Sequence, residues 1–163
     1  MRFFIKPALI EEKQVIFNLI QHYLDELSRF PDEEPDYKDA DGVYQYRYLD
    51  AYWTEKERFP YLMRCEENIA GFALVRVKVE DGGLWEIAEF YVLPEFRQRG
   101  LAMASVTEIF KRHPGEWKIM FNKHNQPGRA LWQKVAERFS KGDILTESDA
   151  SHEYLCFTVA PFA

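Results

Sequence analysis

The stretch of sequence that decides the fold is Phe90-Tyr-Val-Leu-Pro-Glu-Phe-Arg-Gln-Arg-Gly-Leu-Ala102. It begins inside Leu84–Leu93, a run rich in branched and aromatic residues that predicts a strand, and it leads into apolar residues at helical spacing. A turn that contains Gly100 between a strand and a helix N-terminus gathers unpaired backbone N–H groups and the positive end of the helix dipole. Such a turn suits a pyrophosphate group. Arg97 and Arg99 add mobile positive charge at its rim.

Outward from this stretch, hydrophobic periodicity and turn residues predict an alternation of strands and helices. We expect strands at Phe3–Pro7, Pro60–Glu66, Ile69–Val79, Leu84–Leu93, Trp117–Phe121 and Tyr154–Val159, and helices at Val15–Phe30, Val43–Arg58, Leu101–His113 and Leu131–Phe139. The turns at Glu67-Asn68 and Asp81-Gly82-Gly83 predict antiparallel hairpins. This order predicts one α+β domain over residues 1–163 with a mixed sheet.

Composition excludes several classes of protein. Of the 163 residues, 47% are hydrophobic and 29% are charged, which is ordinary for a globular domain, and the net charge is −6. An acidic chain argues against a nucleic-acid partner. No apolar run approaches the ~20 residues that span a bilayer, so we expect no membrane partner. Cys65 and Cys156 lie among apolar residues and form no Cys-x-x-Cys pair, which favours core roles and a cytoplasmic location; no His/Cys/Asp cluster has metal-ligand spacing.

The stretch Phe90–Ala102 resembles the acyl-CoA loop of the GNAT superfamily of N-acyltransferases. A second block follows at the family's usual distance, where Asn125-Gln-Pro-Gly-Arg-Ala-Leu-Trp-Gln-Lys134 is similar to N-x-x-[AG]-x-x-[LF]-Y-x-K. The resemblance covers nearly the whole chain. It implies a mixed, mostly antiparallel central sheet with helices on both faces, in which the fourth strand, Leu84–Leu93, and the fifth strand, Trp117–Phe121, splay apart.

The resemblance also implies acetyl-CoA as co-substrate and a set of residues that bind it. In the family, backbone groups at Phe90, Tyr91 and Val92 pair with the pantetheine arm, and N–H groups of Gln98, Arg99, Gly100, Leu101 and Ala102 hold the pyrophosphate. Asn125 would contact the arm near the thiol. From the residues alone, Asn125 is equally well explained as a helix-capping or turn residue before Pro127.

Transfer of an acyl group to an amine requires a base. A lysine-like amine with a pKa of ~10.4 is protonated at pH 7, and its deprotonation costs about 4.6 kcal/mol. The candidate catalytic carboxylates are Glu89 and Glu86, which have opposite parity and so cannot share a face of a regular strand. Glu89 matches the substrate-facing acid of polyamine acetyltransferases and is preferred, whereas Glu86 matches the base of the histone-type branch.

Two positions depart from the family pattern. Trp132 replaces the tyrosine that usually protonates the departing thiolate, and an indole supplies no acidic proton, which leaves Tyr91 or water as substitutes. Met120 stands where some members have a catalytic Glu or His. These departures motivate an alternative, a noncatalytic acyl-CoA-binding or sensor domain.

The acceptor is expected to be a small amine with a positive charge. The net charge of −6, six acidic residues between Asp32 and Asp41, and the Tyr and Trp rings of residues 44–53 favour a cationic amine, because such rings bind ammonium groups. Each feature also has a structural explanation, since acidic loops are usually solvated and aromatic helices usually form core. Family members often dimerise, so a homodimer is a further expectation.

Overall fold

The computed structural model describes residues 2–33 and 38–163. Its strands are β1 (Phe3–Pro7), β2 (Arg58–Cys65), β3 (Asn68–Lys78), β4 (Leu84–Val92), β5 (Gly115–Asn122), β6 (Leu145–Ser148) and β7 (His152–Val159). Its α-helices are α1 (Lys13–Leu27), α2 (Leu101–Arg112) and α3 (Gln126–Phe139), and short 3-10 helices include η2 (Asp50–Trp53) and η4 (Pro94–Phe96).

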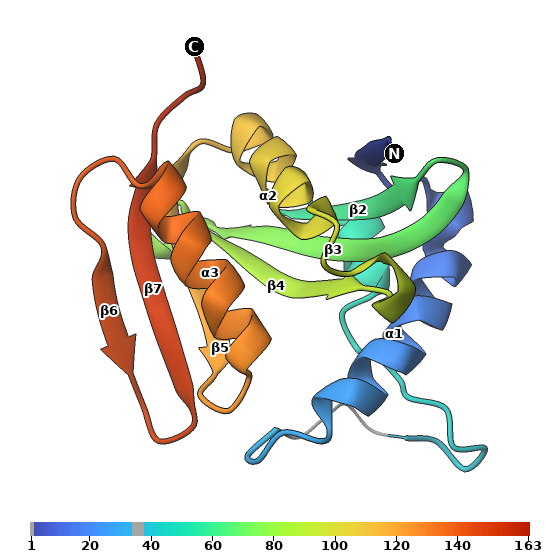
Figure 1. The fold of residues 1–163 in the computed structure, drawn as a ribbon. Coiled ribbons are helices and arrows are strands. Elements are labelled where there is room, and N and C mark those ends of the chain that lie inside the picture. The colour runs from blue at the N-terminus through green and yellow to red at the C-terminus, as the bar shows by residue number, and fades with distance from the viewer. Residues whose placement is uncertain (1, 34–37) are drawn as a thin grey trace.

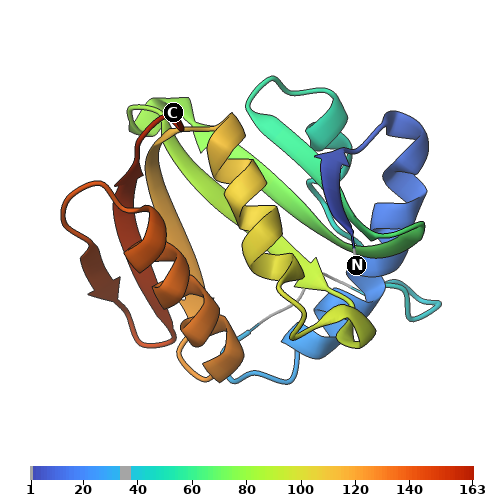
Figure 2. The ribbon, with the colours of Figure 1, turned by 45° about the horizontal axis from the view of Figure 1, so that its top comes forward.

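The seven strands form one sheet in the order β1-β2-β3-β4-β5-β7-β6 (Figure 1). Every neighbouring pair is antiparallel except β4 and β5, which are parallel. Within the described residues, β4 and β5 pair only at Trp85 with Trp117 and Glu86 with Lys118, and beyond these pairs the two strands diverge (Figure 2). The predicted mixed, mostly antiparallel sheet with splayed fourth and fifth strands is therefore confirmed.

Helices cover both faces of the sheet. α2 and α3 lie on one face (Figures 1 and 2), where their apolar residues pack with alternate side chains of β3, β4, β5 and β7. α1 packs on the other face through Ile16, Leu19, Ile20 and Leu24, which follow the helical period of the sequence. Burial of each such side chain contributes about 2 kcal/mol of hydrophobic stabilisation.

An aromatic cluster holds β4 to β5 where they still pair. The ring of Trp85 stacks on those of His113 and Trp117, with centroids 4.4 and 5.8 Å apart. The Tyr61 hydroxyl lies 2.5 Å from Nε2 of His113. Burial lowers the pKa of His113 to about 4, and the neighbouring Arg112 adds to this effect, so the ring is neutral at pH 7.

The predicted helix at Val43–Arg58 is wrong. Apart from the short η2, this segment is irregular, because its groups are held by other parts of the chain. The Gln21 side chain donates to the Tyr44 carbonyl at 2.8 Å and accepts from its N–H at 2.9 Å, and the Trp53 indole donates to the Ala8 carbonyl. Tyr44 and Tyr52 are buried against α1 and the sheet. Aromatic residues have modest helix propensity, so these tertiary contacts decide the conformation.

Several element boundaries also differ from the predictions by a few residues. α1 ends at Leu27 rather than Phe30, and the first hairpin turns at Glu66 and Glu67, with Asn68 already in β3. The edge strand β6 was not predicted. All four of its residues are exposed, so its sequence has no apolar alternation that could indicate a strand.

Candidate active site

A bulge in β4 brings the two candidate carboxylates to the same face of the sheet. Leu74 of β3 pairs with Glu89, but the next residue, Val75, pairs with Ile87, so Ala88 is an extra residue in β4. Such a bulge resets the alternation of side chains. The prediction that Glu86 and Glu89 point to opposite faces is therefore wrong, because it assumed a regular strand.

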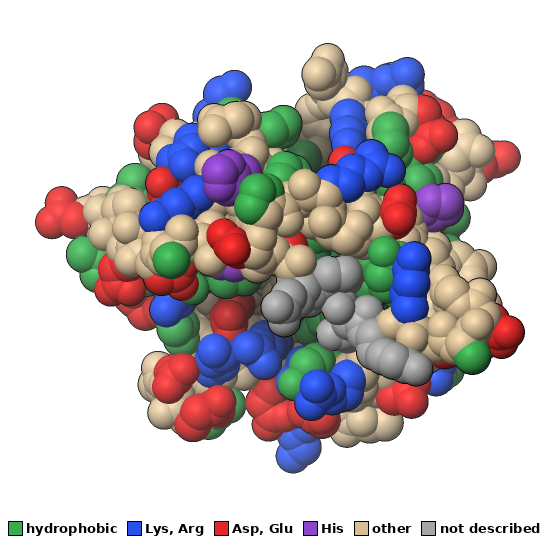
Figure 3. All heavy atoms as spheres, turned by 90° about the horizontal axis from the view of Figure 1, so that it is seen from below, with side chains coloured by type: hydrophobic (Ala, Val, Ile, Leu, Met, Phe, Trp, Pro, Cys, Tyr) green, Lys and Arg blue, Asp and Glu red, His purple; other side chains and the backbone are tan. Residues whose placement is uncertain are grey.

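Both carboxylates line a pocket of about 370 Å³ on the face of the sheet that α1 covers. We call it the acceptor pocket, and its lining consists of Tyr46, Tyr48, Arg58, Arg76, Lys78, Glu86, Ile87, Ala88, Glu89, Lys118, Met120 and Tyr154. The lining comes from β2, β3, β4, β5, β7 and the segment before η2. Figure 3 views the molecule from below and shows Lys and Arg side chains beside Asp and Glu side chains near the middle of this face.

Two tyrosines hold the Glu89 carboxylate. The hydroxyl of Tyr23, from α1, donates to Oε1 at 2.8 Å, and the hydroxyl of Tyr46 donates to Oε2 at 3.0 Å. Burial, and next the adjacent Glu89, raise the pKa of Tyr23 well above its ordinary value, so Tyr23 stays protonated and remains a donor. Neither tyrosine was predicted from the sequence, because no short pattern connects residues 23 and 46 with residue 89.

Glu86 has a different environment. Its Oε1 atom lies 3.0 Å from Nη2 of Arg76 and 3.0 Å from Nζ of Lys78, so it bridges two cations of β3. The surroundings of the two carboxylates therefore differ, because Glu86 is paired with cations whereas Glu89 accepts from tyrosine hydroxyls.

The cofactor region lies at the other end of β4 and in the turn that follows. From Ile87 to Val92 the edge of β4 that faces β5 has no strand partner among the described residues. The turn has positive φ angles at Gln98 (60°) and Gly100 (86°) and ends at the N-terminus of α2. No side chain of the described residues caps that N-terminus, and a Cβ on Gly100 would meet none of their atoms within 4 Å. Open, uncapped amides of this kind fit a pyrophosphate.

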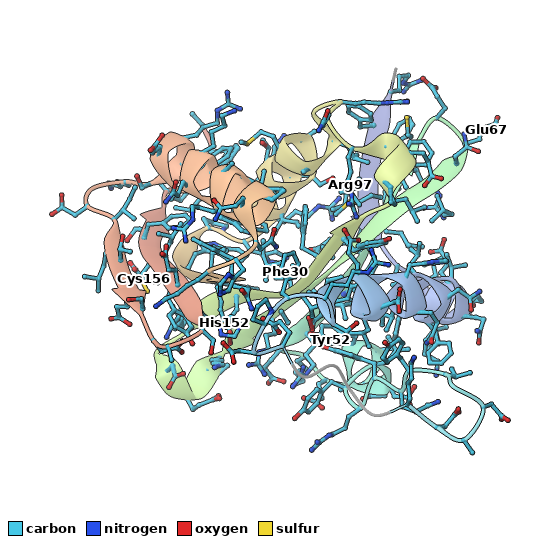
Figure 4. All side chains as sticks on the ribbon, turned by 60° about the horizontal axis from the view of Figure 1, so that its bottom comes forward. Phe30, Tyr52, Glu67, Arg97, His152 and Cys156 are labelled. Carbon is cyan, nitrogen blue, oxygen red and sulfur yellow. The ribbon has the colours of Figure 1, made fainter. Side chains whose placement is uncertain are left out.

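Arg97 is held in place, so the prediction of a mobile charge is wrong for this residue. Its guanidinium makes a two-pronged ion pair with Glu26 of α1 at 2.8 and 2.7 Å, and its Nε donates to the Val92 carbonyl at 2.8 Å. It also lies over the Tyr91 ring, 5.4 Å from the centroid. In this way Arg97, labelled in Figure 4, ties the turn after β4 to α1.

Asn125 is the N-cap of α3, as the alternative explanation from the sequence predicted. Its Oδ1 accepts a hydrogen bond from the Gly128 N–H at 3.0 Å. A Cβ on Gly128 would lie 2.7 Å from Nδ2 of Asn125, which explains why a glycine follows at this spacing. Nδ2 makes no hydrogen bond with the residues that the structure describes, so capping leaves one donor available for a ligand.

The two departures from the family pattern have different structural consequences. Trp132 is only 7% exposed and packs edge-on against Phe90, with ring centroids 5.1 Å apart, so it belongs to the core. Met120 is 52% exposed and lines the acceptor pocket. Tyr91 is buried, and burial raises its pKa, with a further contribution from Glu26.

The acidic segment after α1 is partly described. Glu33 accepts from the Asn122 amide at 3.0 Å and lies 2.5 Å from Nε2 of His152, near the end of β5 and the start of β7; His152 is labelled in Figure 4. Asp39 accepts the N–H groups of Asp41 and Val43 and so builds a local turn. Glu34 and Asp36 lie outside the described residues. None of the described acids of this segment lines the acceptor pocket, so the cationic acceptor stays a prediction.

The cations of the pocket were not predicted from the sequence either. Arg76 and Lys78 are separated by one residue on a predicted strand, and this spacing places both side chains on the same face. That signal could have been found without a structure. Lys118 and Arg58 come from other strands, so only the strand order shows that they lie near Arg76 and Lys78.

Two further findings concern the described part of the chain as a whole. No three His, Cys, Asp or Glu side chains come together as a metal site within residues 2–33 and 38–163. None of the helices described in these ranges is long and apolar enough to cross a membrane.

The chain is similar to known proteins in sequence and in fold. A family model for the acetyltransferase (GNAT) family matches residues 19–137, and no curated protein matches the chain. Three solved structures share the fold. The PaiA N-acetyltransferase from Thermoplasma acidophilum, in complex with coenzyme A, is 13% identical with a TM-score of 0.65, and the match covers 97% of this chain and 99% of that one. An acetyltransferase from Thermus thermophilus is 14% identical with a TM-score of 0.67, and the match covers 98% of each chain. Arabidopsis thaliana NAA60 with a bisubstrate analogue is 13% identical with a TM-score of 0.65, and the match covers 96% of this chain and 98% of that one. The family match covers most of the chain, and the chain belongs to the GNAT family of acetyltransferases.

Proposed function

We propose that residues 1–163 form one N-acetyltransferase domain that moves the acetyl group of acetyl-CoA directly to the amine of a small acceptor. The observation that carries this proposal is the divergence of β4 and β5 beyond Glu86 and Lys118. At this divergence the unpaired edge of β4 runs from the α2 N-terminus to the acceptor pocket. One strand therefore serves a cofactor and an acceptor.

The cofactor region fits acetyl-CoA, the co-substrate of this family. N–H groups of Gln98, Arg99, Gly100, Leu101 and Ala102 would hold the pyrophosphate, and the backbone of Phe90, Tyr91 and Val92 would pair with the pantetheine arm. The free Nδ2 of Asn125 would donate to the same arm. Arg97 acts indirectly, because its ion pair with Glu26 fixes the turn. When bound, acetyl-CoA supplies the acetyl group as a thioester.

Glu89 is the proposed base. An ammonium acceptor that enters the pocket meets the Glu89 carboxylate, whose orientation is fixed by Tyr23 and Tyr46. Glu89 takes one proton from the ammonium, the neutral amine attacks the thioester carbonyl, a C–N bond forms and the C–S bond breaks. The nitrogen gives its second proton to the departing thiolate as the amide forms. Positioned bases of this kind accelerate proton transfer by roughly 10²- to 10⁴-fold.

The thiolate that leaves has no tyrosine donor at position 132. The buried Trp132 cannot replace it, since an indole does not release a proton. A thiol with a pKa of ~8.5 leaves tolerably well as thiolate and then takes the second proton of the nitrogen, while the proton held by Glu89 goes to solvent. We therefore assign no dedicated acid.

The proposal is tested by incubation of the protein with acetyl-CoA and a panel of primary amines, with free thiol and acetylated product measured together. We expect stoichiometric thiol and amide with at least one amine. If acetyl-CoA binds in calorimetry but no amine yields thiol above the hydrolysis blank, the noncatalytic acyl-CoA-binding alternative, which Trp132 and Met120 motivate, is correct instead.

A further inference from the structure

Among the residues that the structure describes, more cations than carboxylates line the acceptor pocket, although the chain is acidic. Four cations line it, Arg58, Arg76, Lys78 and Lys118, against two described carboxylates, Glu86 and Glu89. The local balance among these residues is 4 − 2 = +2, whereas the whole chain carries −6. The overall composition therefore does not explain the charge of the pocket.

The partners of these cations show where positive charge is left over. Arg58 is paired with Glu55 at 3.2 Å, and Arg76 and Lys78 share the single Oε1 atom of Glu86. These two cations, each about one third exposed, are thus matched by one negative charge. Nη1 of Arg76 makes no hydrogen bond or ion pair with any described residue.

Lys118 is the second source of positive charge. Its ammonium lies 4.7 Å from the centroid of the Tyr154 ring, and within residues 2–33 and 38–163 no carboxylate approaches it within 4 Å. Its Cα is the register partner of Glu86, so Lys118 adjoins the Arg76 and Lys78 pair across β4. Three half-buried cations around one carboxylate repel one another, and a bound anion would relieve this repulsion.

The phosphates of the cofactor do not account for this charge. The pyrophosphate region lies at the N-terminus of α2, which follows the C-terminal end of β4. The cations instead surround Glu86, near the start of β4, on the face of the sheet opposite α2. An anion bound there belongs to the acceptor.

We propose that the acceptor is an amine that also carries a carboxylate. This inference rests on the proposed function, because it assigns the amine to Glu89 and the carboxylate to Arg76, Lys78 and Lys118. A strand rises about 3.3 Å per residue, so positions 89 and 86 lie roughly 7 to 10 Å apart along β4. A few carbon atoms span the remaining distance between the side chains, which matches a pocket of about 370 Å³. This inference departs from the cationic acceptor that the sequence favoured, because an amine that also carries a carboxylate is a zwitterion with no net charge.

Three matched four-carbon amines test the charge at the far end of the acceptor. They are 4-aminobutanoate, butylamine and 1,4-diaminobutane, which present an anion, a methyl group and a cation. With saturating acetyl-CoA, we expect kcat/KM for 4-aminobutanoate to exceed that for butylamine by about tenfold, with the diamine lowest, and the advantage to shrink as salt is added.

The variant Lys118→Gln identifies the source of this preference. It should reduce the kcat/KM ratio of 4-aminobutanoate to butylamine by about tenfold, mainly through KM. Lys111→Gln is the control, because Lys111 is an exposed residue at the end of α2, remote from the pocket lining, and it should retain the ratio. A ratio of one or less in the native protein, or an equal change in both variants, would overturn the inference.

Binding separates this inference from the proposed function. Calorimetry on the protein saturated with coenzyme A should detect 4-aminobutanoate, with affinity that Lys118→Gln weakens. If that binding is found but no amine releases thiol, the carboxylate site stands and acetyl transfer fails. If butylamine or the diamine is the better acceptor, or if 4-aminobutanoate neither binds nor reacts, the inference of an acidic acceptor fails.

Discussion

The cofactor region and the acceptor pocket are built from the same strand in two different ways. The cofactor region uses the contiguous residues 90–102, and its ligand groups are backbone amides at an unpaired strand edge and an uncapped helix N-terminus. The acceptor pocket is lined by twelve residues spread from residue 46 to residue 154, most of them through their side chains. Backbone recognition thus needs one local conformation, whereas side-chain recognition needs the whole strand order.

This difference shows which substitutions each region tolerates. In the cofactor region, side chains matter where they set the backbone, as with the positive φ of Gly100 and the ion pair of Arg97. In the acceptor pocket, identity and charge matter at each position. Substitutions in the cofactor region should therefore change acetyl-CoA affinity, and substitutions in the acceptor pocket should change the kinetics with the acceptor.

The largest effect is expected for Gly100→Glu. It places a bulky, negatively charged side chain at a residue with φ of 86° beside the proposed pyrophosphate position, so acetyl-CoA affinity in calorimetry should fall more than about 100-fold. Gly142→Glu is the matched control, since Gly142 also has a positive φ (90°) and open space around its Cβ position but lies before β6. Equal losses in both variants would refute the cofactor assignment.

Glu89→Gln should affect the acceptor side alone. We expect turnover at pH 7 to fall about 100-fold with acetyl-CoA affinity unchanged, and the loss to be smaller at pH 9, where more of the acceptor is neutral. Glu67→Gln, at the exposed β2–β3 turn, is the control for a lost carboxylate. An equal loss at both pH values would assign the base to another group.

Both regions depend on the aromatic cluster of Trp85, His113 and Trp117, which holds β4 to β5 where they pair. We expect acid to lower the stability that this cluster contributes. The pKa of His113 is about 4 in the folded protein and ~6.5 in the unfolded chain, so only the unfolded chain takes up a proton between these values. The contribution of His113 to the free energy of unfolding is nearly constant above pH 6.5 and is lower by about 2 kcal/mol at pH 5. Denaturant unfolding at pH 7 and pH 5 measures this fall.

The comparison for this measurement is between two histidine variants. His113→Gln should lose this part of the pH dependence, whatever its absolute stability, whereas His22→Gln, at an exposed position of α1, should retain it. A pH dependence that survives in His113→Gln would exclude the cluster as the acid-sensitive element.

The smallest effect is expected for Tyr23→Phe. It removes one hydrogen bond that orients Glu89 without removing the base, so kcat should fall about tenfold and KM for acetyl-CoA should not change. Because Tyr23 acts through Glu89, its loss should also shift the acidic limb of the kcat profile. A change in KM for acetyl-CoA with an unaltered pH profile would indicate a structural role only.

The sequence predicted much of the fold because its decisive signals are local. The turn around Gly100, the hairpins and the apolar spacing of α1 each depend on neighbouring residues. The splayed fourth and fifth strands were implied by the resemblance to the family, and the structure confirms them. The segment Val43–Arg58 was predicted wrongly because its conformation is decided by Gln21 and α1, which lie far away in the sequence.

The acceptor pocket was predictable only in part, because its side chains are brought together by contacts between residues that lie far apart in the sequence. Glu89 and Glu86 were found, but the extra residue Ala88 that turns them to one face has no sequence signature. Likewise, Tyr23 reaches Glu89 only through the packing of α1 on the sheet.

The most direct test of the account is a crystal structure of the protein with coenzyme A. We predict the pyrophosphate on the amides of residues 98–102, the pantetheine arm along the unpaired edge of β4 from Ile87 to Val92, and the thiol opening toward Glu89 in the acceptor pocket. A coenzyme bound elsewhere, or a thiol that opens on the α2 and α3 face of the sheet, would contradict the claim that one strand joins the two regions.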